Sequence, residues 1–207
     1  MKQVSTSILS SEDKFKNIEK LNNSNTDYIH LDIMDGKFVR NKFITPAELR
    51  ELLNKIKKPV DVHLMVSNPE KYIDVLALYN IDYITIHYEI KDFEKYIDMI
   101  KDLGFKVGLS IKPKTKVEEI FPILDKLNLV LIMSVEPGKS GQRFLKYSKD
   151  KIDKLKEEIT KRGLLTKISV DGGICDEVFE YIENADILVS ASYVLSDLKN
   201  IDKLKEI

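Results

Sequence analysis

The sequence has little of several features that mark whole classes of protein. Its one cysteine, Cys175, excludes an intrachain disulfide and suits a reducing compartment. No apolar run approaches the roughly 18 residues of a membrane span, and residues 1–15 lack the apolar core of a signal peptide. Lysine plus arginine (33) and aspartate plus glutamate (34) nearly cancel, so no basic field attracts nucleic acid. We therefore expect a soluble, cytoplasmic protein without a nucleic-acid or membrane partner.

Short apolar runs alternate with amphipathic segments from one end of the chain to the other. The apolar runs predict strands at 4–9, 28–34, 60–66, 83–88, 107–111, 129–135, 168–170 and 187–192. Helical spacing of apolar residues predicts helices at 13–21, 46–56, 69–79, 93–103, 116–127, 148–162, 176–183 and 197–206. Pro122 lies inside the fifth of these segments and weakens the prediction of a regular helix there.

Eight successive strand–helix units indicate a parallel sheet with right-handed crossovers. That number favours a closed (β/α)8 barrel, for which 207 residues lies at the short end of the usual range. An open, doubly wound sheet is the alternative that the same alternation permits. Because no linker or low-complexity stretch divides the chain, we expect a single barrel domain spanning residues 1–207.

All three histidines fall near the carboxyl ends of predicted strands. His30, His63 and His87 lie in the second, third and fourth strands. Asp32 shares a strand face with His30 because side chains alternate, and Asp171 ends the seventh strand in the motif SVDGGI. In a (β/α)8 barrel these strand ends surround the active site. The pattern therefore predicts a cluster of imidazoles and carboxylates at the barrel mouth.

Two imidazoles and two carboxylates, from His30, Asp32, His63 and Asp171, suit one divalent metal ion. This donor set favours Zn, Fe(II), Mn or Co over Ca. The same side chains also form salt bridges or buried hydrogen bonds in proteins without a metal, and their spacing does not separate the two interpretations. His87, two residues before Glu89, is open in the same way between a partner of the site and an ordinary strand-end histidine.

Glycine-containing loops follow the last three predicted strands. They carry the sequences SVEPGKSGQRF at 134–144, DGGI at 171–174 and SAS at 190–192. The same region of many (β/α)8 barrels binds a phosphate group. Loop glycines most often only form turns, but three such loops in one neighbourhood favour a phosphate site.

Five segments together resemble the ribulose-phosphate 3-epimerase family. They are SILSSE, HLDIMDGKFV, DVHLMV, SVEPGKSGQRF and VDGGI, and the match extends from residue 7 to near residue 195. The resemblance implies a (β/α)8 barrel of the ribulose-phosphate-binding type. It also implies a metal-dependent isomerase of the pentose phosphate pathway that interconverts D-ribulose 5-phosphate and D-xylulose 5-phosphate.

The resemblance carries roles onto individual positions. It implies that His30, Asp32, His63 and Asp171 bind the metal and that Asp32 and Asp171 also form the acid–base pair. The residues that it places against the sugar phosphate are Ser7, Met34, His63, Met65, Met133, Ser140, Gly141, Gln142, Arg143, Gly172, Gly173, Ala191 and Ser192.

The implied chemistry explains these residue types. Inverting a carbon beside a ketone requires removal of its proton and return of a proton to the opposite face, which is work for two carboxyl groups. The intermediate is an enediolate, whose negative charge a divalent metal stabilises. Thioether side chains offer a polarisable wall that does not compete for the proton.

The chain departs from the family pattern at its substrate loops. Lys139 and Ser140 replace Phe and Gly, Ala191 replaces Gly, and Lys37 and Arg40 replace His and Pro. These changes leave open an epimerase of a related ketose phosphate such as allulose 6-phosphate.

A non-catalytic barrel that binds a phosphorylated ligand is the alternative from another class. A decarboxylase or aldolase on a similar barrel is disfavoured, because the third strand carries His63 and no lysine. Whether the chain forms a homo-oligomer is also open.

Overall fold

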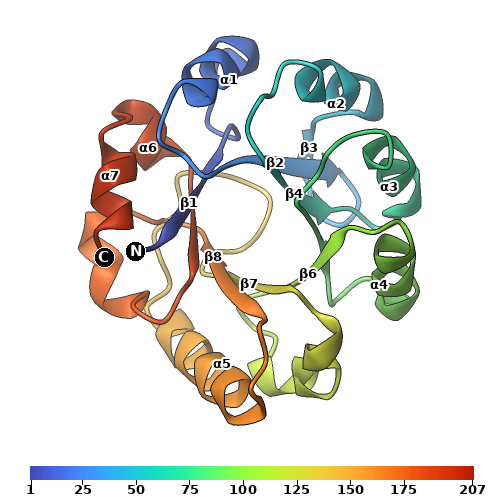
Figure 1. The fold of residues 1–207 in the computed structure, drawn as a ribbon, viewed down its shortest axis with the longest axis vertical. Helices are drawn as coiled ribbons and strands as arrows, with labels where there is room; N and C mark the ends of the chain where they lie inside the picture. Colours follow the sequence, from blue (N-terminus) through green and yellow to red (C-terminus); the bar gives the residue numbers. More distant parts are fainter.

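Nine strands form one sheet, and eight of them close into a barrel (Figure 1). The computed structural model describes residues 1–207. The barrel strands are β1 (Gln3–Ser7), β2 (Tyr28–Asp35), β4 (Val60–Met65), β5 (Tyr83–His87), β6 (Lys106–Ile111), β7 (Leu129–Met133), β8 (Lys167–Asp171) and β9 (Ile187–Ser190). Neighbouring barrel strands are parallel, and pairing of β1 with both β2 and β9 closes the ring.

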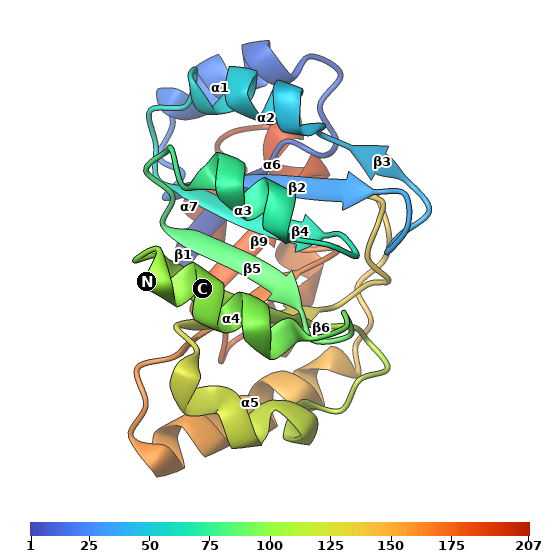
Figure 2. The ribbon, with the colours of Figure 1, turned by 90° about the vertical axis from the view of Figure 1, so that its right-hand side faces the viewer.

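Helical segments cover the outside of the barrel (Figures 1 and 2). They are α1 (Lys14–Asn22), α2 (Pro46–Leu53), α3 (Glu70–Leu76), α4 (Phe93–Asp102), η1 (Val117–Lys126), α5 (Ser148–Arg162), η2 (Asp176–Tyr181), α6 (Ser192–Ser196) and α7 (Asn200–Lys205). The segments η1 and η2 are 3-10 helices. Pro122 lies within η1 and lacks the N–H of a regular α-helix, which agrees with the weaker prediction there.

Alternation along each strand divides the core into two parts. Residues such as Ile29, Leu31 and Ile33 of β2 belong to the large apolar cluster that includes the buried faces of the surrounding helices. The opposite face of the same strand carries His30 and Asp32 into the barrel, where both are buried. The two-residue period thus places apolar side chains outward and the chemical groups inward.

The predicted (β/α)8 barrel is confirmed, and each of the eight predicted strands overlaps an observed one. The ninth strand, β3 (Lys42–Phe43), was absent from the prediction. It pairs antiparallel with the end of β2, Met34 opposite Phe43 and Asp35 opposite Lys42, because the 36–41 loop turns back across the mouth. No helix of the structure has the length and apolar character that crossing a membrane requires.

Candidate active site

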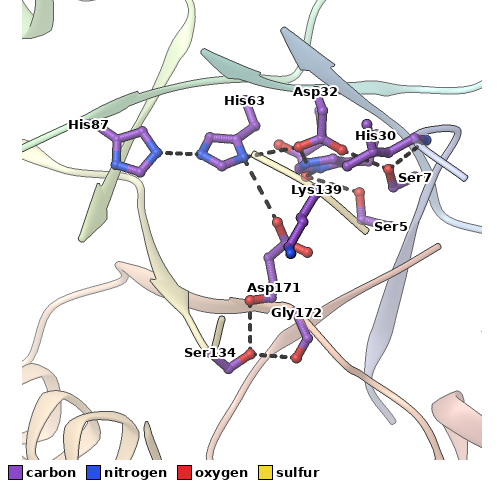
Figure 3. Close-up of polar contacts among 12 residues, drawn as sticks. Ser5, Ser7, His30, Asp32, His63, His87, Ser134, Lys139, Asp171 and Gly172 are labelled. Atoms are coloured by element: carbon purple, nitrogen blue, oxygen red, sulfur yellow. Dashed lines mark hydrogen bonds and ion pairs between the residues drawn. The ribbon is translucent and has the colours of Figure 1, made fainter. Parts of the chain in front are cut away.

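Four side chains from three strands meet at the carboxyl end of the barrel (Figure 3). They are His30 and Asp32 of β2, His63 of β4 and Asp171 of β8, and one donor atom of each lies within 4.8 Å of the others. The register pairs Asp32 directly with His63 on the neighbouring strand. The predicted cluster of imidazoles and carboxylates is therefore present as a single group, in which His30, Asp32 and His63 are buried and Asp171 is partly exposed.

The His30 ring contacts the carboxylate of Asp61, which is not a member of the four-residue cluster. Its Nδ1 lies 2.8 Å from Oδ2 of Asp61, which also accepts a 2.9 Å hydrogen bond from the Ser5 hydroxyl. Its Nε2 is buried without a hydrogen-bond partner and lies 3.4 Å from Oδ1 of Asp32. A buried nitrogen directed into a group of carboxylates is what a metal ligand requires, so the donor set fits a divalent ion.

His63 occupies the centre of the cluster. Its Nδ1 lies 3.2 Å from Oδ1 of Asp32 and 3.9 Å from Oδ2 of Asp171. Its Nε2 lies 2.9 Å from Nε2 of His87, whose Nδ1 donates a 3.1 Å hydrogen bond to Oε2 of Glu89. All three rings are fully buried, so each ring nitrogen depends on these contacts alone.

The two candidate catalytic carboxyl groups have opposite electrostatic environments. Burial raises the pKa of Asp32, but the charges and hydrogen bonds of His30 and His63 outweigh it and hold that pKa far below its usual range. Burial, followed by the nearby charge of Asp32, raises the pKa of Asp171 to about 6. Asp32 is therefore ionised at all ordinary pH values, while Asp171 takes up a proton at a higher pH than a free carboxyl group does.

The pKa values of His30 and His87 are also shifted in opposite directions. Burial disfavours the charged form of His30, yet the carboxylates of Asp61 and Asp32 raise its pKa well above the usual value. Burial lowers the pKa of His87 to about 4, so this ring is neutral near pH 7. A cation bound at the cluster would take the place of the proton on His30.

The tip of β8 is fixed by Ser134. Its hydroxyl lies 2.8 Å from the carbonyl oxygen of Asp171 and 2.7 Å from that of Gly172, and its N–H donates to Asp171 at 2.8 Å. Ser134 was not singled out from the sequence. Asp61 was also missed, although its position two residues before His63 places both on one strand face.

A cavity of about 610 Å³ opens directly above the cluster. It is lined by Asp32 and Asp171 and by most of the predicted substrate residues: Ser7, Met65, Met133, Ser140, Gly141, Gln142, Arg143, Gly172, Gly173, Ala191 and Ser192. Met34 does not line it but is buried against Met65 and Val39. His63 lies beneath the cavity with the other ring donors.

The loops after β7 and β8 pack backbone against backbone. A Cβ on Gly173 would come within 2.5 Å of the Phe144 nitrogen and 2.9 Å of the Gln142 oxygen, and this residue has φ +65°. Glycine is therefore required at this contact. Ala191, which replaces a family glycine, has φ −107°, so its methyl group meets no left-handed strain.

Solved structures share this fold. Phosphoribosylanthranilate isomerase from Thermotoga maritima superposes with a TM-score of 0.68 at 14% identity, covering 100% of this chain and 97% of that one. Tryptophan synthase subunit alpha from Campylobacter jejuni gives 0.64 at 15% identity, covering 98% and 93%. At these identities the likeness concerns the barrel alone.

Sequence relatives are more specific. Ribulose-phosphate 3-epimerase of Bacillus subtilis is 37% identical over 96% of this chain and 95% of its own length. The protein of the same name from Helicobacter pylori strain J99 is 37% identical over 86% and 83%. A sequence model of the ribulose-phosphate 3 epimerase family matches residues 3–195. The chain therefore belongs to the ribulose-phosphate 3-epimerase family, whose curated members are carbohydrate isomerases.

Proposed function

We propose that the chain is a metal-dependent epimerase that interconverts D-ribulose 5-phosphate and D-xylulose 5-phosphate. The observation that carries this proposal is the group of four donors from β2, β4 and β8 within 4.8 Å of one another, with two carboxyl groups facing the cavity. Inversion beside a ketone needs one group to remove a proton and another to return one to the opposite face.

His30, Asp32, His63 and Asp171 would hold the metal. Two imidazoles and two carboxylates suit Zn, Fe(II), Mn or Co, and the unpartnered Nε2 of His30 supports the fit. When bound, a divalent ion supplies a Lewis acid that stabilises the negative charge of the enediolate. Asp32 and Asp171 have pKa values shifted in opposite directions beside the cavity. Such shifts are typical of catalytic groups, and the non-catalytic alternative does not explain them.

The electrostatics of the free protein divide the proton-transfer roles. Asp32 starts ionised and accepts the proton from C3, while Ser7 holds its Oδ2 with a 2.7 Å hydrogen bond. Asp171 starts with the higher pKa and returns a proton from the other side. In the reverse reaction the two groups exchange roles, as microscopic reversibility requires.

The phosphate would lie against the loops that follow β7, β8 and β9. Gly141, Gly173, Ser192 and Arg143 line the cavity there, so backbone N–H groups and a guanidinium could reach a phosphate. Backbone amides and an arginine are typical partners of a phosphate group. Phosphate bound at this end positions the reacting carbon over the carboxyl groups.

The direct test is exchange of the C3 proton of ribulose 5-phosphate in deuterated water. Incorporation of deuterium with formation of xylulose 5-phosphate is expected, together with loss of both on chelation and recovery with Co2+ or Zn2+. A chain freed of metal that exchanges at the full rate would refute the metal-dependent mechanism. A chain that binds substrate without any exchange would favour the non-catalytic alternative.

A six-carbon ketose phosphate such as allulose 6-phosphate is the competing substrate. Lys139 and Ser140 stand at the edge of the cavity where the family pattern has Phe and Gly, so the contacts of the loop differ in this chain. Comparison of kcat/KM on the two sugar phosphates decides between them. We propose the pentose, because the departures lie in the loops and spare the four candidate ligands.

A further inference from the structure

A continuous line of side chains leads from His63 away from the cavity. His63 Nε2 contacts His87 Nε2 at 2.9 Å (Figure 3). On the other side of the His87 ring, Nδ1 contacts Glu89 Oε2 at 3.1 Å. His87 lies on β5, one strand beyond His63, and its ring packs against Phe38 with centroids 4.5 Å apart. Neither His87 nor Glu89 lines the cavity, so neither touches the substrate that the proposed function assigns there.

The hydrogen-bond directions in this line follow from its outer end. A carboxylate has no donor, so Glu89 accepts and the proton of His87 lies on Nδ1. In that tautomer of His87 the Nε2 lone pair is free, and the 2.9 Å contact then requires the proton to lie on Nε2 of His63. The Asp32 carboxylate accepts a hydrogen bond from Nδ1 of His63 when no cation is bound, and a cation in the cluster would replace that proton and meet the Nδ1 lone pair because Nε2 keeps its own proton.

We propose that His87 and Glu89 are positioning residues that fix the tautomer and ring orientation of His63, so that its Nδ1 lone pair points into the four-donor cluster. The inference rests on the proposed metal-dependent function. Partners of this kind typically change metal affinity about 10–100-fold when they are removed.

Glu89 is itself held rigidly. Its Oε1 accepts hydrogen bonds from the Lys112 N–H at 2.7 Å and the Thr115 hydroxyl at 2.5 Å. The ammonium group of Lys151 on α5 donates to the carbonyl oxygens of Lys112, Pro113 and Thr115 in the same loop. The loop between β6 and η1 thus links the outer helix α5 to the partly buried carboxylate of Glu89, which gives His87 a fixed acceptor.

The test compares Co2+ affinity of the full-length wild type with that of His87→Phe, His87→Gln and Glu89→Gln. Phenylalanine keeps a planar ring against Phe38 but removes the acceptor, so its Kd for Co2+ should rise about 10–100-fold. Glutamine at position 87 restores an acceptor oxygen and should recover part of the loss. Ser110→Ala is the matched control. Ser110 lies on β6 directly opposite His87 of β5, and its buried hydroxyl has no hydrogen-bond partner, so this variant should keep the wild-type Kd.

A second readout does not depend on bound metal. The 15N shifts of His63 in the metal-free wild type should report a proton on Nε2, and those of His87→Phe and Glu89→Gln a lower occupancy of that proton. If His87→Phe does not fold, Glu89→Gln carries the same comparison. Wild-type affinity together with an unchanged occupancy of the His63 Nε2 proton in the variants would overturn the positioning role and leave the proposed function standing. A wild type that binds no Co2+ would overturn both.

Discussion

Ser7 donates a 2.7 Å hydrogen bond to Oδ2 of Asp32, while Oδ1 of the same carboxylate lies within 3.4 Å of a nitrogen of both His30 and His63. The two oxygens therefore have separate partners. Oδ2 is held by the hydroxyl of Ser7, a residue that also lines the cavity. Oδ1 faces the candidate metal ligands His30 and His63. This division suits a carboxylate that binds a cation and exchanges a proton at once.

Asp32→Asn and Asp171→Asn should each lower kcat by about 100-fold or more, because under the proposed function each removes a proton carrier and a charged metal ligand. Both variants should keep the circular dichroism spectrum of the wild type, since an amide fills the same space. Epimerisation by either variant at the wild-type rate would refute its assigned role.

The metal-free protein should lose stability as the pH rises from 3.8 to about 6, because of Asp171. Its pKa is about 6 in the fold and 3.8 as a free group, so the stabilisation is complete below 3.8 and is lost as pH rises through about 6. Asp171→Asn removes this penalty and should stabilise the metal-free chain at pH 8 by up to about 3 kcal/mol. The difference should vanish below pH 4 in chemical denaturation measured at both pH values, and a constant difference would contradict the explanation.

Lys139→Ala and Arg143→Ala should raise KM for the sugar phosphate more than they lower kcat. Both residues line the cavity, and the contacts that we propose they make with the phosphate would be equally strong before and during proton transfer. Steady-state kinetics with ribulose 5-phosphate measures KM and kcat. Lys146→Ala is the control, because it removes a cation from the same loop and cavity wall and should change KM less than the other two variants do. Unchanged KM in both variants would place the phosphate elsewhere.

Asp61→Asn should weaken metal binding through His30. The amide no longer accepts the Nδ1 proton as a charged partner, so the Nε2 lone pair is less firmly directed into the cluster. We expect Kd for Co2+ to rise about 10–100-fold by competition with a chelator. Ser5→Ala, which removes only the 2.9 Å hydrogen bond to Asp61, should have a smaller effect.

The residues at the strand ends were predictable because the carboxyl ends of all strands of a (β/α)8 barrel lie at the same face. His30, Asp32, His63 and Asp171 could be grouped from periodicity and from the order of the strands. The partners behind them could not. The pairing of Asp61 with His30 depends on the register of β2 against β4, which the sequence leaves open, and the hold of Ser134 on Asp171 depends on how two loops meet.

The shapes of the loops also could not be predicted from the sequence. The turn of residues 36–41 and the short strand β3 follow from contacts with β2 and with the loop after β7, where the Asn41 amide donates to the Gly138 oxygen at 2.8 Å. Residues 97 positions apart decide that shape, so no local pattern predicts it. The placement of Met34 beneath the cavity wall, against Val39 of this same loop, has the same origin.

The donors of the cluster are far apart along the chain, since Asp171 enters on β8 and the other three on β2 and β4. A fragment that ends before β8 lacks Asp171, and one that begins after β2 lacks His30 and Asp32, so high-affinity binding of a divalent ion would report assembly of the ring of strands that carries these donors. A bound ion would also oppose opening of that ring, and the free energy of unfolding would rise as RT ln(1 + [ion]/Kd). If the chain takes up such an ion during synthesis, the complete donor set would form only after β8 (Lys167–Asp171) has been synthesised.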